Sequence, residues 1–475
     1  MMVEETEAYI KEISKKGSIL GLESIRRLCQ LLTEAYPENG KLLQDRIPAI
    51  HIAGTNGKGS VGAMLSAIYQ EAGFKVGHFS SPAVFQYEEM FQINGRPIGK
   101  ERLAVLYSEV EKACRRIEEE ERPHPTIFEV ETAAAFLYFW REGCQIMIIE
   151  CGMGGAEDAT NVMTHPMACL ISSIGKDHAK FLGESEEEIA EVKAGILVDQ
   201  APLISAAQTE SVSAILKKKA KEMGAAFYQV ESAAIKNASF SFGEEGVIQA
   251  FSYKGLELEL PLAGLWQPEN AALVLEAVWA LRKGTRKEFL SQGSSKKSLC
   301  EEETSYTSPV DSSFALSDEI IKEGLKKVSW PGRLQKLGKL PSGAELYIDG
   351  AHNPAAAAKL RDSIRLYFKG KRLIFIMGVL ADKDFREVLK ETLPLGERLF
   401  TVKPDNPRAL SAEELAWAAE PYMEKVKAEG SVRKALYEAD QAADAETIVL
   451  AFGSLSYLAE VKKTFAELEK EKRSC

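Results

Sequence analysis

Short apolar runs alternate with longer segments of helical spacing along most of the chain. Short apolar runs are typical of buried parallel strands, whereas apolar residues spaced by three and four positions predict helices packed on one face. The alternation therefore predicts a mainly parallel sheet covered by helices. In the first half, strands are expected at 48–53, 75–79, 145–150, 167–174 and 202–205, and helices at 61–72, 129–140 and 270–282.

Two segments break this pattern before a second alternation begins. Residues 240–262 contain short alternating strands, which predicts a small antiparallel sheet at the edge of the larger one. Residues 284–317 are polar and rich in serine, so they have little to bury and predict a disordered insertion. Strands at 345–348, 372–378, 398–402 and 447–452 and helices at 318–328 and 354–368 then predict a second α/β unit. We expect two domains, 1–328 and 329–475.

Composition narrows the class of protein. The 475 residues, 45% of them hydrophobic, are enough for two or three domain cores. The net charge of −11 argues against non-specific nucleic-acid binding, because a phosphate backbone would be repelled. The acidic start and the lack of a window of about 18 apolar residues predict neither a secretory signal nor a membrane span. Seven cysteines without metal-type pairing predict reduced thiols in a cytoplasmic protein.

The strongest chemical signal is a glycine-rich turn at 51–60, His-Ile-Ala-Gly-Thr-Asn-Gly-Lys-Gly-Ser. Glycines let the backbone approach a ligand closely, and the N-terminus of the following helix favours anions. Lys58 can reach the β/γ-phosphates of a nucleotide, and the Ser60 hydroxyl can meet Mg²⁺. The turn departs from the common P-loop pattern at Ile52 and Gly59, but an ordinary turn does not require a lysine between two glycines. The predicted phosphate-binding residues are Gly54, Thr55, Asn56, Gly57, Lys58, Gly59 and Ser60.

Two further loops are expected at the same edge of the sheet. Glu150 ends the strand 145–150 and is followed by a glycine-rich loop, and open parallel sheets bind ligands at the carboxyl ends of their strands. Asp177 and His178 follow the next strand, so the topology brings them toward Glu150 and Lys58. Each could be an exposed or structural loop residue when taken alone. Together they predict a metal-binding or catalytic role.

Lys193 lies on a helix that a capping box of Ser185 and Glu188 is expected to start. At 100° per residue, Lys193 falls within the apolar face of this helix. A lysine that faces inward loses solvation, which lowers the pKa of its amine and leaves some of it neutral. A lysine whose amine reaches outward to solvent fits the same pattern, and the sequence does not choose between the two.

Phe128 stands inside a second capping box, formed by Thr126 and Glu129. This box starts a helix and needs no ligand. The pattern alone favours Phe128 as a core residue, with an aromatic platform for a flat heterocycle as the alternative.

In the second α/β unit, Asp349 and His352 lie between the strand 345–348 and the helix 354–368. The carboxylate can accept hydrogen bonds from ribose hydroxyls, and the imidazole would lie near nucleotide phosphates. The loops around Asp382 and Gly453 end two further strands at the same edge, so a second ligand-facing surface is predicted there. Ordinary turn chemistry accounts for any one of these loops by itself.

Taken in order, these segments resemble the folylpolyglutamate synthase/dihydrofolate synthase family, a branch of the Mur ligase superfamily. The resemblance runs from about Gly21 to Leu458 and depends on many short motifs in the same order. The motifs are Leu20-Gly21-Leu22-Glu23, the turn 54–60, Ser80-Ser81-Pro82, Phe128-Glu129, Glu150 with Gly152-Met153-Gly154-Gly155, Asp177-His178, Lys193-Ala194-Gly195-Ile196, Gln267 with Asn270, Trp330-Pro331-Gly332-Arg333, Asp349-Gly350-Ala351-His352-Asn353-Pro354, Asp382-Lys383-Asp384, Arg408-Ala409-Leu410 and Gly453-Ser454-Leu455.

The resemblance implies an N-terminal P-loop ATPase domain, with a mainly parallel sheet and a small antiparallel edge sheet, followed by a C-terminal Rossmann-like α/β domain. It implies an ATP-dependent amide ligase that phosphorylates the terminal glutamate carboxylate of a folate to an acyl phosphate. The amine of L-glutamate then attacks this acyl phosphate. The implied ligands are ATP, Mg²⁺, folate or dihydropteroate, and L-glutamate, and the implied enzyme is monomeric.

The resemblance also implies roles for single residues. The implied Mg²⁺ ligands are Ser81, Glu150 and His178, beside Ser60 of the turn; the catalytic residues are Lys58, His178 and Lys193; the nucleotide contacts are Asn270, Arg333, Asp349 and His352; and Phe128 lines the pterin pocket. Lys193 is implied to be carbamylated by CO₂. Carbamylation needs a neutral amine, which agrees with the inward-facing interpretation of Lys193.

One departure from the family pattern leaves a substrate undecided, and two alternative functions stay open. Ile19 stands where bifunctional relatives can carry an aspartate for dihydropteroate, so the use of dihydropteroate is undecided. One alternative is a Mur ligase that acts on UDP-linked peptides. We expect the roughly 47 residues before the turn to be too few for a separate UDP-binding domain. The other is a nucleotide-binding switch without ligase activity, which would leave Lys193, Asp349 and His352 without a use.

Overall fold

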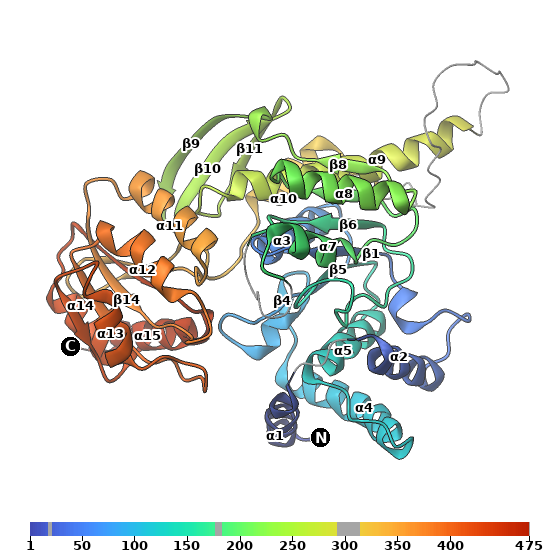
Figure 1. Ribbon diagram of the computed structural model, residues 1–475, viewed down its shortest axis with the longest axis horizontal. Coiled ribbons are helices and arrows are strands. Elements are labelled where there is room, and N and C mark those ends of the chain that lie inside the picture. Colours follow the sequence, from blue (N-terminus) through green and yellow to red (C-terminus); the bar gives the residue numbers. More distant parts are fainter. Residues whose placement is uncertain (18–20, 176–182, 292–313, 475) are drawn as a thin grey trace.

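The computed structural model describes residues 1–17, 21–175, 183–291 and 314–474. The chain forms two lobes built on separate sheets, with a third, smaller sheet between them (Figure 1). We call residues 1–328 the N-terminal lobe and residues 329–474 the C-terminal lobe, following the predicted boundary. The predicted α/β class, with mainly parallel sheets and a small antiparallel sheet, is confirmed.

The N-terminal lobe contains an eight-stranded sheet in the order β4-β3-β2-β5-β1-β6-β7-β8. Neighbouring strands from β2 to β8 are parallel, and β3 and β4 extend one edge in antiparallel orientation. Because helices cover both faces, the central strands are buried and mostly apolar, with His51, His78 and Glu150 as polar exceptions. The strands are β1 (Ala49–Ala53), β2 (Val76–Phe79), β3 (Phe91–Ile93), β4 (Arg96–Pro97), β5 (Ile146–Glu150), β6 (Ala168–Ile171), β7 (Leu203–Ser205) and β8 (Phe227–Gln229).

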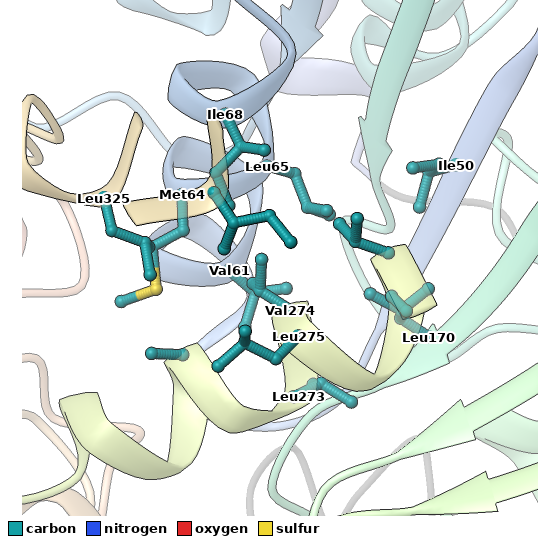
Figure 2. Close-up of a cluster of buried hydrophobic side chains, with 14 of the residues drawn as sticks. Ile50, Val61, Met64, Leu65, Ile68, Leu170, Leu273, Val274, Leu275 and Leu325 are labelled. Carbon is teal, nitrogen blue, oxygen red and sulfur yellow. The ribbon is translucent and has the colours of Figure 1, made fainter. Parts of the chain in front are cut away.

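The helices of this lobe pack on both faces of the sheet, with one core on the face of α3 and α9 and two cores on the other face, one with α2, α4 and α5 and one with α7 and α8. Side chains alternate along β5, so Ile146 and Ile148 pack with α3 and α9, whereas Met147 and Ile149 pack with α2, α4 and α5. Figure 2 shows the first core, where α3, α9 and α10 meet β1 and β6. The helices are α1 (Val3–Ile13), α2 (Glu23–Ala35), α3 (Lys58–Glu71), α4 (Lys100–Glu119), α5 (Ile127–Arg141), α7 (Glu186–Ala194), α8 (Glu210–Glu222), α9 (Gln267–Ser291) and α10 (Asp318–Lys326).

The small antiparallel sheet bridges the two lobes. Its residue Phe251 packs in the core around α9, whereas Val247 packs in a core of the C-terminal lobe. The hydroxyl of Tyr367 in that lobe donates to Gln249 Oε1 at 3.1 Å. The predicted sheet is thus confirmed, but it is a separate sheet instead of an extension of the large one, because its strands pair with one another. The strands are β9 (Ile235–Gly243), β10 (Gly246–Tyr253) and β11 (Leu256–Leu260).

The C-terminal lobe contains a six-stranded sheet in the order β12-β13-β17-β14-β15-β16. All neighbouring pairs are parallel except β12 with β13. The strands are β12 (Gln335–Lys339), β13 (Glu345–Ile348), β14 (Arg372–Met377), β15 (Arg398–Thr401), β16 (Val426–Ala428) and β17 (Thr447–Phe452), and the helices are α11 (Pro354–Tyr367), α12 (Phe385–Thr392), α13 (Ala412–Ala419), α14 (Val432–Gln441) and α15 (Leu458–Ser474).

The predicted boundary at 328/329 stays a prediction, and the packing on either side supports it. The α10 helix belongs to the N-terminal lobe, since Gly324 lies against the Cα of Ile68 in α3 and Lys327 pairs with Glu71 at 2.5 Å. The C-terminal sheet begins with β12, at Gln335.

The predicted disordered insertion 284–317 is wrong at both ends. Residues 284–291 continue α9, which runs from Gln267 to Ser291. Phe314 stacks on Phe74 with ring centroids 5.0 Å apart, and the Ser317 hydroxyl accepts a hydrogen bond from the Ile320 amide at the start of α10. The polar composition of the segment did not indicate the extension of α9 or the contacts of Phe314 and Ser317. The rest of the predicted insertion, 292–313, lies outside the described residues.

Two expectations from composition can be compared with the structure. No helix within the described ranges is long and apolar enough to span a bilayer. Five cysteines are buried free thiols, as expected for core residues: Cys29, Cys114, Cys144, Cys151 and Cys169.

Candidate functional site

The glycine turn (residues 54–57) joins the carboxyl end of β1 to the N-terminus of α3, as predicted. Its backbone is held against the end of the neighbouring strand, because the amides of Thr55 and Asn56 donate to Ser173 O at 2.9 and 3.2 Å. Gly54 and Gly57 adopt φ values of +144° and +98°, a region that favours glycine. A Cβ on Gly54 would lie 1.9 Å from the Ser172 hydroxyl oxygen. Both positions therefore favour glycine, and position 54 leaves no room for a side chain.

Helix α3 begins at Lys58, three residues earlier than the apolar pattern predicted. The Lys58 side chain folds back over the turn, with its Nζ 3.2 Å from Gly54 O and 3.7 Å from Glu150 Oε1. The first turn of α3 thus presents free backbone N–H groups and a cation on the same side, which is an arrangement suited to phosphate oxygens.

Glu150 ends β5 beside this turn and is only 5% exposed. Burial raises the pKa of its carboxyl group to about 7, and the positive charges of Lys58 and Arg333 oppose that rise. A buried carboxylate with one neighbouring ammonium group is poised to gain from a second cation.

The loop after Glu150 packs against the helix that carries Lys193. A Cβ on Gly155 would lie 2.7 Å from Val192 O, so this glycine allows the close approach. Asp158 shapes the loop by accepting hydrogen bonds from the Met153 amide at 2.8 Å and the Thr160 hydroxyl at 2.5 Å. Burial raises the pKa of Asp158, and these hydrogen bonds oppose that rise.

Lys193 faces inward, which decides between the two interpretations of its helix. The predicted capping box of Ser185 and Glu188 starts α7. Lys193 is 4% exposed, and its Nζ donates to Gly54 O at 3.0 Å. The structure thus brings together Lys58, Glu150 and Lys193 around the first residue of the glycine turn.

Helix α9 completes the wall of the turn. The Gln267 side chain donates to Ser60 Oγ at 3.3 Å and accepts from Asn270 Nδ2 at 2.9 Å. Asn270 lies directly over Gly57, since a Cβ on that glycine would be 2.6 Å from the Asn270 side-chain oxygen. The sequence assigned a role to Asn270 but none to Gln267, although both belong to one motif.

The opposite wall comes from the C-terminal lobe. Asp349 is buried at the end of β13, where its carboxylate accepts from the amides of Leu334 and Ala351 at 2.8 and 2.7 Å. Burial raises the pKa of Asp349, and nearby Arg333 opposes that rise. Asn353, the N-cap of α11, donates to Asn56 Oδ1 at 3.2 Å and so connects this wall to the glycine turn.

A cleft with about 500 Å³ of empty space lies between these walls. Its lining combines backbone with charged and polar side chains from both lobes, as a small-molecule site requires. The cleft contains the predicted residues Asn270, Arg333, Asp349 and His352, and also two that the sequence did not assign, Trp266 and Lys359. The complete lining is Asn56, Gly57, Trp266, Asn270, Arg333, Asp349, Gly350, Ala351, His352, Ala356 and Lys359.

Trp266 and Lys359 line the cleft, although the sequence assigned no role to either. Lys359 lies in the second turn of α11, and burial lowers the pKa of its amine. The neighbouring segment before α9 is fixed to the same helix, because the Leu265 amide donates to Ser363 Oγ at 3.1 Å. Trp266 directly precedes the Gln267 motif, which was the one available signal for it. Nothing in the sequence pattern distinguished Lys359 from other polar residues of its helix.

Phe128 lies at the predicted start of α5, beside the glycine-rich loop that follows Glu150. It stacks on Phe79 with ring centroids 5.9 Å apart, and a Cβ on Gly152 would be 2.5 Å from the tip of its ring. The half-buried ring therefore packs as part of the core and also borders the loop after Glu150. Both interpretations of Phe128 agree with this position.

The predicted metal ligands are only partly described. Glu150 and Ser60 lie at the glycine turn, and Ser81 follows the carboxyl end of β2, a neighbour of β5 in the sheet. His178 and Asp177 lie outside the described residues, as does Ile19. In the ranges that the structure describes, no three His, Cys, Asp or Glu side chains are grouped to hold a metal ion. Ser60, Ser81 and Glu150 offer oxygen atoms, the donor type that Mg²⁺ prefers.

Comparison with known proteins first shows the class of protein to which the chain belongs. Residues 52–278 match the Mur ligase middle domain, and residues 332–455 match the Mur ligase, glutamate ligase domain. These two segments contain the glycine turn and the Asp349 wall respectively, so the chain has the domain content of a Mur ligase.

Individual relatives then define the family. The dihydrofolate synthase/folylpolyglutamate synthase of Bacillus subtilis is 30% identical over 469 residues, which cover 97% of this chain and 98% of that protein. The structure of Mycobacterium tuberculosis folylpolyglutamate synthase complexed with ADP and AMPPCP has a TM-score of 0.79 at 27% identity, covering 98% of both chains. E. coli FolC in complex with DHPP and ADP has a TM-score of 0.77 at 26% identity, covering 100% of this chain and 99% of that one. The chain belongs to the dihydrofolate synthase/folylpolyglutamate synthase family.

Proposed function

We propose that the protein is an ATP-dependent ligase that adds L-glutamate to the γ-carboxylate of a folate through an acyl phosphate. The observation that carries this proposal is the cleft between the lobes, bounded by the glycine turn on one side and by Asp349 on the other. The family relatives named folylpolyglutamate synthase, including one complexed with ADP and AMPPCP, support the same assignment.

ATP would lie across the cleft with its phosphates on the glycine turn. The backbone N–H groups at the start of α3 and the Lys58 ammonium group would neutralise the phosphate oxygens. The buried Asp349 carboxylate would accept from the ribose hydroxyls, with Asn270, Arg333 and His352 as further contacts. The phosphate and ribose ends of one nucleotide would thus be held by different lobes.

The proposed Mg²⁺ ligands are Ser60, Ser81, Glu150 and His178, and the oxygen atoms of the first three are of the donor type that this ion prefers. The raised pKa of Glu150 supports this role, because burial disfavours the charge of its carboxylate more than Lys58 and Arg333 offset it, and a bound cation would favour that charge. When bound, the ion supplies charge that stabilises the γ-phosphoryl group during its transfer.

Lys193 is the proposed site of carbamylation. Its amine is buried against the glycine turn and close to Lys58 and Glu150, so a carbamate there would add a carboxylate-like group beside the phosphates. Forming the carbamate joins the neutral amine nitrogen to the carbon of CO₂ and releases one proton.

The reaction is a phosphoryl transfer followed by an acyl transfer. A γ-carboxylate oxygen of folate attacks the γ-phosphorus of ATP, the bond to the β-phosphate oxygen breaks, and ADP leaves. The amine of L-glutamate attacks the acyl carbon to give a tetrahedral intermediate, which loses a proton and expels phosphate as the amide forms. The protein mainly positions the reactants and supplies cations, while closure of the two lobes excludes water from the acyl phosphate.

Phe128 is the proposed contact for the pterin ring.

Dihydropteroate is a second proposed acceptor, supported by relatives whose names include dihydrofolate synthase. We also propose that the enzyme is a monomer and acts in the cytoplasm. The buried free thiols support the second point, since reduced cysteines are usual there.

The proposal is tested by ADP release from the purified protein, with mass spectrometry of the folate product. Turnover is expected when ATP, Mg²⁺, a reduced folate and L-glutamate are present together, and the product gains one glutamyl residue. Replacing tetrahydrofolate by dihydropteroate as the sole acceptor decides the second activity. ADP release that is indifferent to the pterin would reject the folate assignment and favour a nucleotide-dependent switch.

A further inference from the structure

A short segment of the N-terminal lobe is inserted into the core of the C-terminal lobe. We call residues 81–86 the strap; it follows β2 and begins with Ser81. Val84 of the strap is 8% exposed and belongs to a buried cluster whose other buried members all lie between Leu340 and Phe465. Figure 1 shows this part of the chain, before β4, beside the C-terminal lobe.

The contact of Val84 depends on a glycine in the segment that joins the lobes. A Cβ on Gly332 would meet Val84 Cγ1 at 3.2 Å, and Leu458 and Leu455 at 3.6 and 3.7 Å. Gly332 also has a φ of +68°, which disfavours any other residue. The side chain of Val84 therefore fills a space that Gly332 leaves open against α15 and the turn before it.

A second contact lies next to the first. The Lys462 ammonium nitrogen of α15 is 3.9 Å from the centre of the Phe85 ring, a cation–π interaction. The Val84 and Phe85 amides donate to Glu89 Oε2 at 3.3 and 3.0 Å, which fixes the backbone between the two side chains. The strap thus presents two adjacent side chains to the C-terminal lobe on a hydrogen-bonded backbone.

The chain on the other side of the strap is anchored in the N-terminal lobe. The Tyr87 hydroxyl donates to Glu131 Oε1 of α5 at 2.6 Å and lies 2.5 Å from the Tyr107 hydroxyl of α4. Strand β2 fixes the opposite end through its pairing with β5. The strap is therefore held in one lobe at both ends and in the other lobe at its middle.

Three peptide bonds separate Ser81 from Val84, so the Cα atoms of these residues lie within about 11 Å of each other. We propose that Val84, with Phe85, is a positioning residue for Ser81: its insertion into the C-terminal lobe holds Ser81 at the metal side of the phosphate site. This inference rests on the proposed function for the role of Ser81. The attachment of the strap itself does not depend on that function. Other contacts between the lobes, such as that of Asn353 with Asn56, do not involve Val84.

The experiment compares Val84→Ala with Val461→Ala. Val461 is fully buried on α15 in the same cluster, so its truncation makes a similar cavity in the C-terminal lobe while the strap keeps all its side chains. Lys462→Met is the third variant, because it removes the charge over Phe85 at an exposed position and leaves the buried cluster unchanged.

Hydrogen exchange of the strap amides is measured first, without any ligand. Val84→Ala is expected to speed exchange at 81–86 by roughly tenfold or more, and Lys462→Met to speed it less, whereas Val461→Ala leaves it within about twofold of wild type. Unchanged exchange in Val84→Ala, or equally fast exchange in Val461→Ala, would overturn the attachment of the strap.

Steady-state kinetics then test the positioning role. Val84→Ala is expected to lower kcat by roughly tenfold and to raise the Mg²⁺ concentration for half-maximal rate, while the KM for ATP stays within about twofold. Fast exchange with kcat and Mg²⁺ dependence equal to those of Val461→Ala would overturn the positioning role. A wild-type protein without ligase turnover would refute the proposed function and with it the role of Ser81; the exchange result would then decide only whether the strap is attached.

Discussion

The side-chain amine of Lys193 donates to the backbone carbonyl of Gly54 at 3.0 Å and so joins two residues 139 positions apart. Gly54 is the first residue of the glycine turn, and the same carbonyl also accepts from Lys58 at 3.2 Å. One peptide oxygen thus holds two lysines at the phosphate site. A mutation of either lysine changes the charge beside the same turn.

Lys193→Ala is expected to lower kcat by roughly 100-fold or more, because the proposed carbamate would be lost from the site. Addition of a short carboxylic acid such as acetate should restore part of the rate by occupying the vacated space. ADP release with and without acetate measures both effects. Wild-type activity in this variant would remove the carbamate from the mechanism.

Lys58→Ala is expected to reduce kcat/KM for ATP by about 1000-fold, because it removes the cation nearest to the turn. It also leaves the Glu150 carboxylate without its 3.7 Å partner, so the pKa of Glu150 should rise further. Lys75→Ala is a suitable control, since Lys75 pairs with Glu142 and precedes β2, at the edge of the parallel sheet opposite the turn. Similar losses in both variants would contradict a specific role for Lys58.

Gly57→Ala should abolish nucleotide binding, whereas Gly73→Ala should not. Both glycines have positive φ, +98° and +87°, so alanine strains the backbone by roughly 1–2 kcal/mol at either position. Only at Gly57 does the new Cβ collide with a neighbour, the Asn270 side chain at 2.6 Å, because nothing lies within 4 Å at Gly73. Calorimetric titration with ADP distinguishes the two variants. Equal affinities would show that the fit between Gly57 and Asn270 does not matter for binding.

The stability of the ligand-free protein should depend on pH through Glu150. Its pKa is raised from 4.5 to about 7 on folding, so the folded state holds a proton that the unfolded state loses at lower pH. The free energy of unfolding should therefore fall as the pH rises from about 4.5 to about 7, by roughly 3 kcal/mol from this group. Glu150→Gln should remove this part of the dependence.

Urea unfolding of both proteins at several pH values measures the difference. Glu131, whose pKa burial also raises to about 7, contributes the same trend in both proteins and cancels in the comparison. Parallel profiles for wild type and Glu150→Gln would contradict a raised pKa at Glu150.

The strands and the glycine turn were predictable because their signals are local. The strands at 345–348 and 447–452 match the structure at both ends, since each is an apolar run that begins with a single polar residue. The expected strand 167–174 ends earlier, at Ile171, because Ser173 turns its carbonyl oxygen toward the glycine turn instead of a neighbouring strand. Short or weakly apolar strands were missed, namely β3, β4, β8, β12 and β16, since few of their positions are buried or their runs are too brief.

Residues of the site could be predicted to lie together only where the order of strands in the sheet determines which residues are close. Strand ends of a parallel sheet meet at one edge, so Lys58 and Glu150 could be brought together from the sequence. The burial of Lys193 could not, because a helical face does not say whether its lysine reaches outward. The surroundings of Lys359 and Val84 depend on how the two lobes meet. The sequence pattern of either lobe does not indicate that contact.

The central claim is that ATP activates the γ-carboxylate of a folate. It is tested most directly with a folate labelled with ¹⁸O in both γ-carboxylate oxygens, by mass spectrometry of the phosphate released with L-glutamate present. One carboxylate oxygen leaves with the phosphoryl group, so each turnover should yield phosphate that carries one ¹⁸O atom while the amide keeps the other. Unlabelled phosphate alongside the glutamylated product would contradict the acyl phosphate and the function proposed for this site.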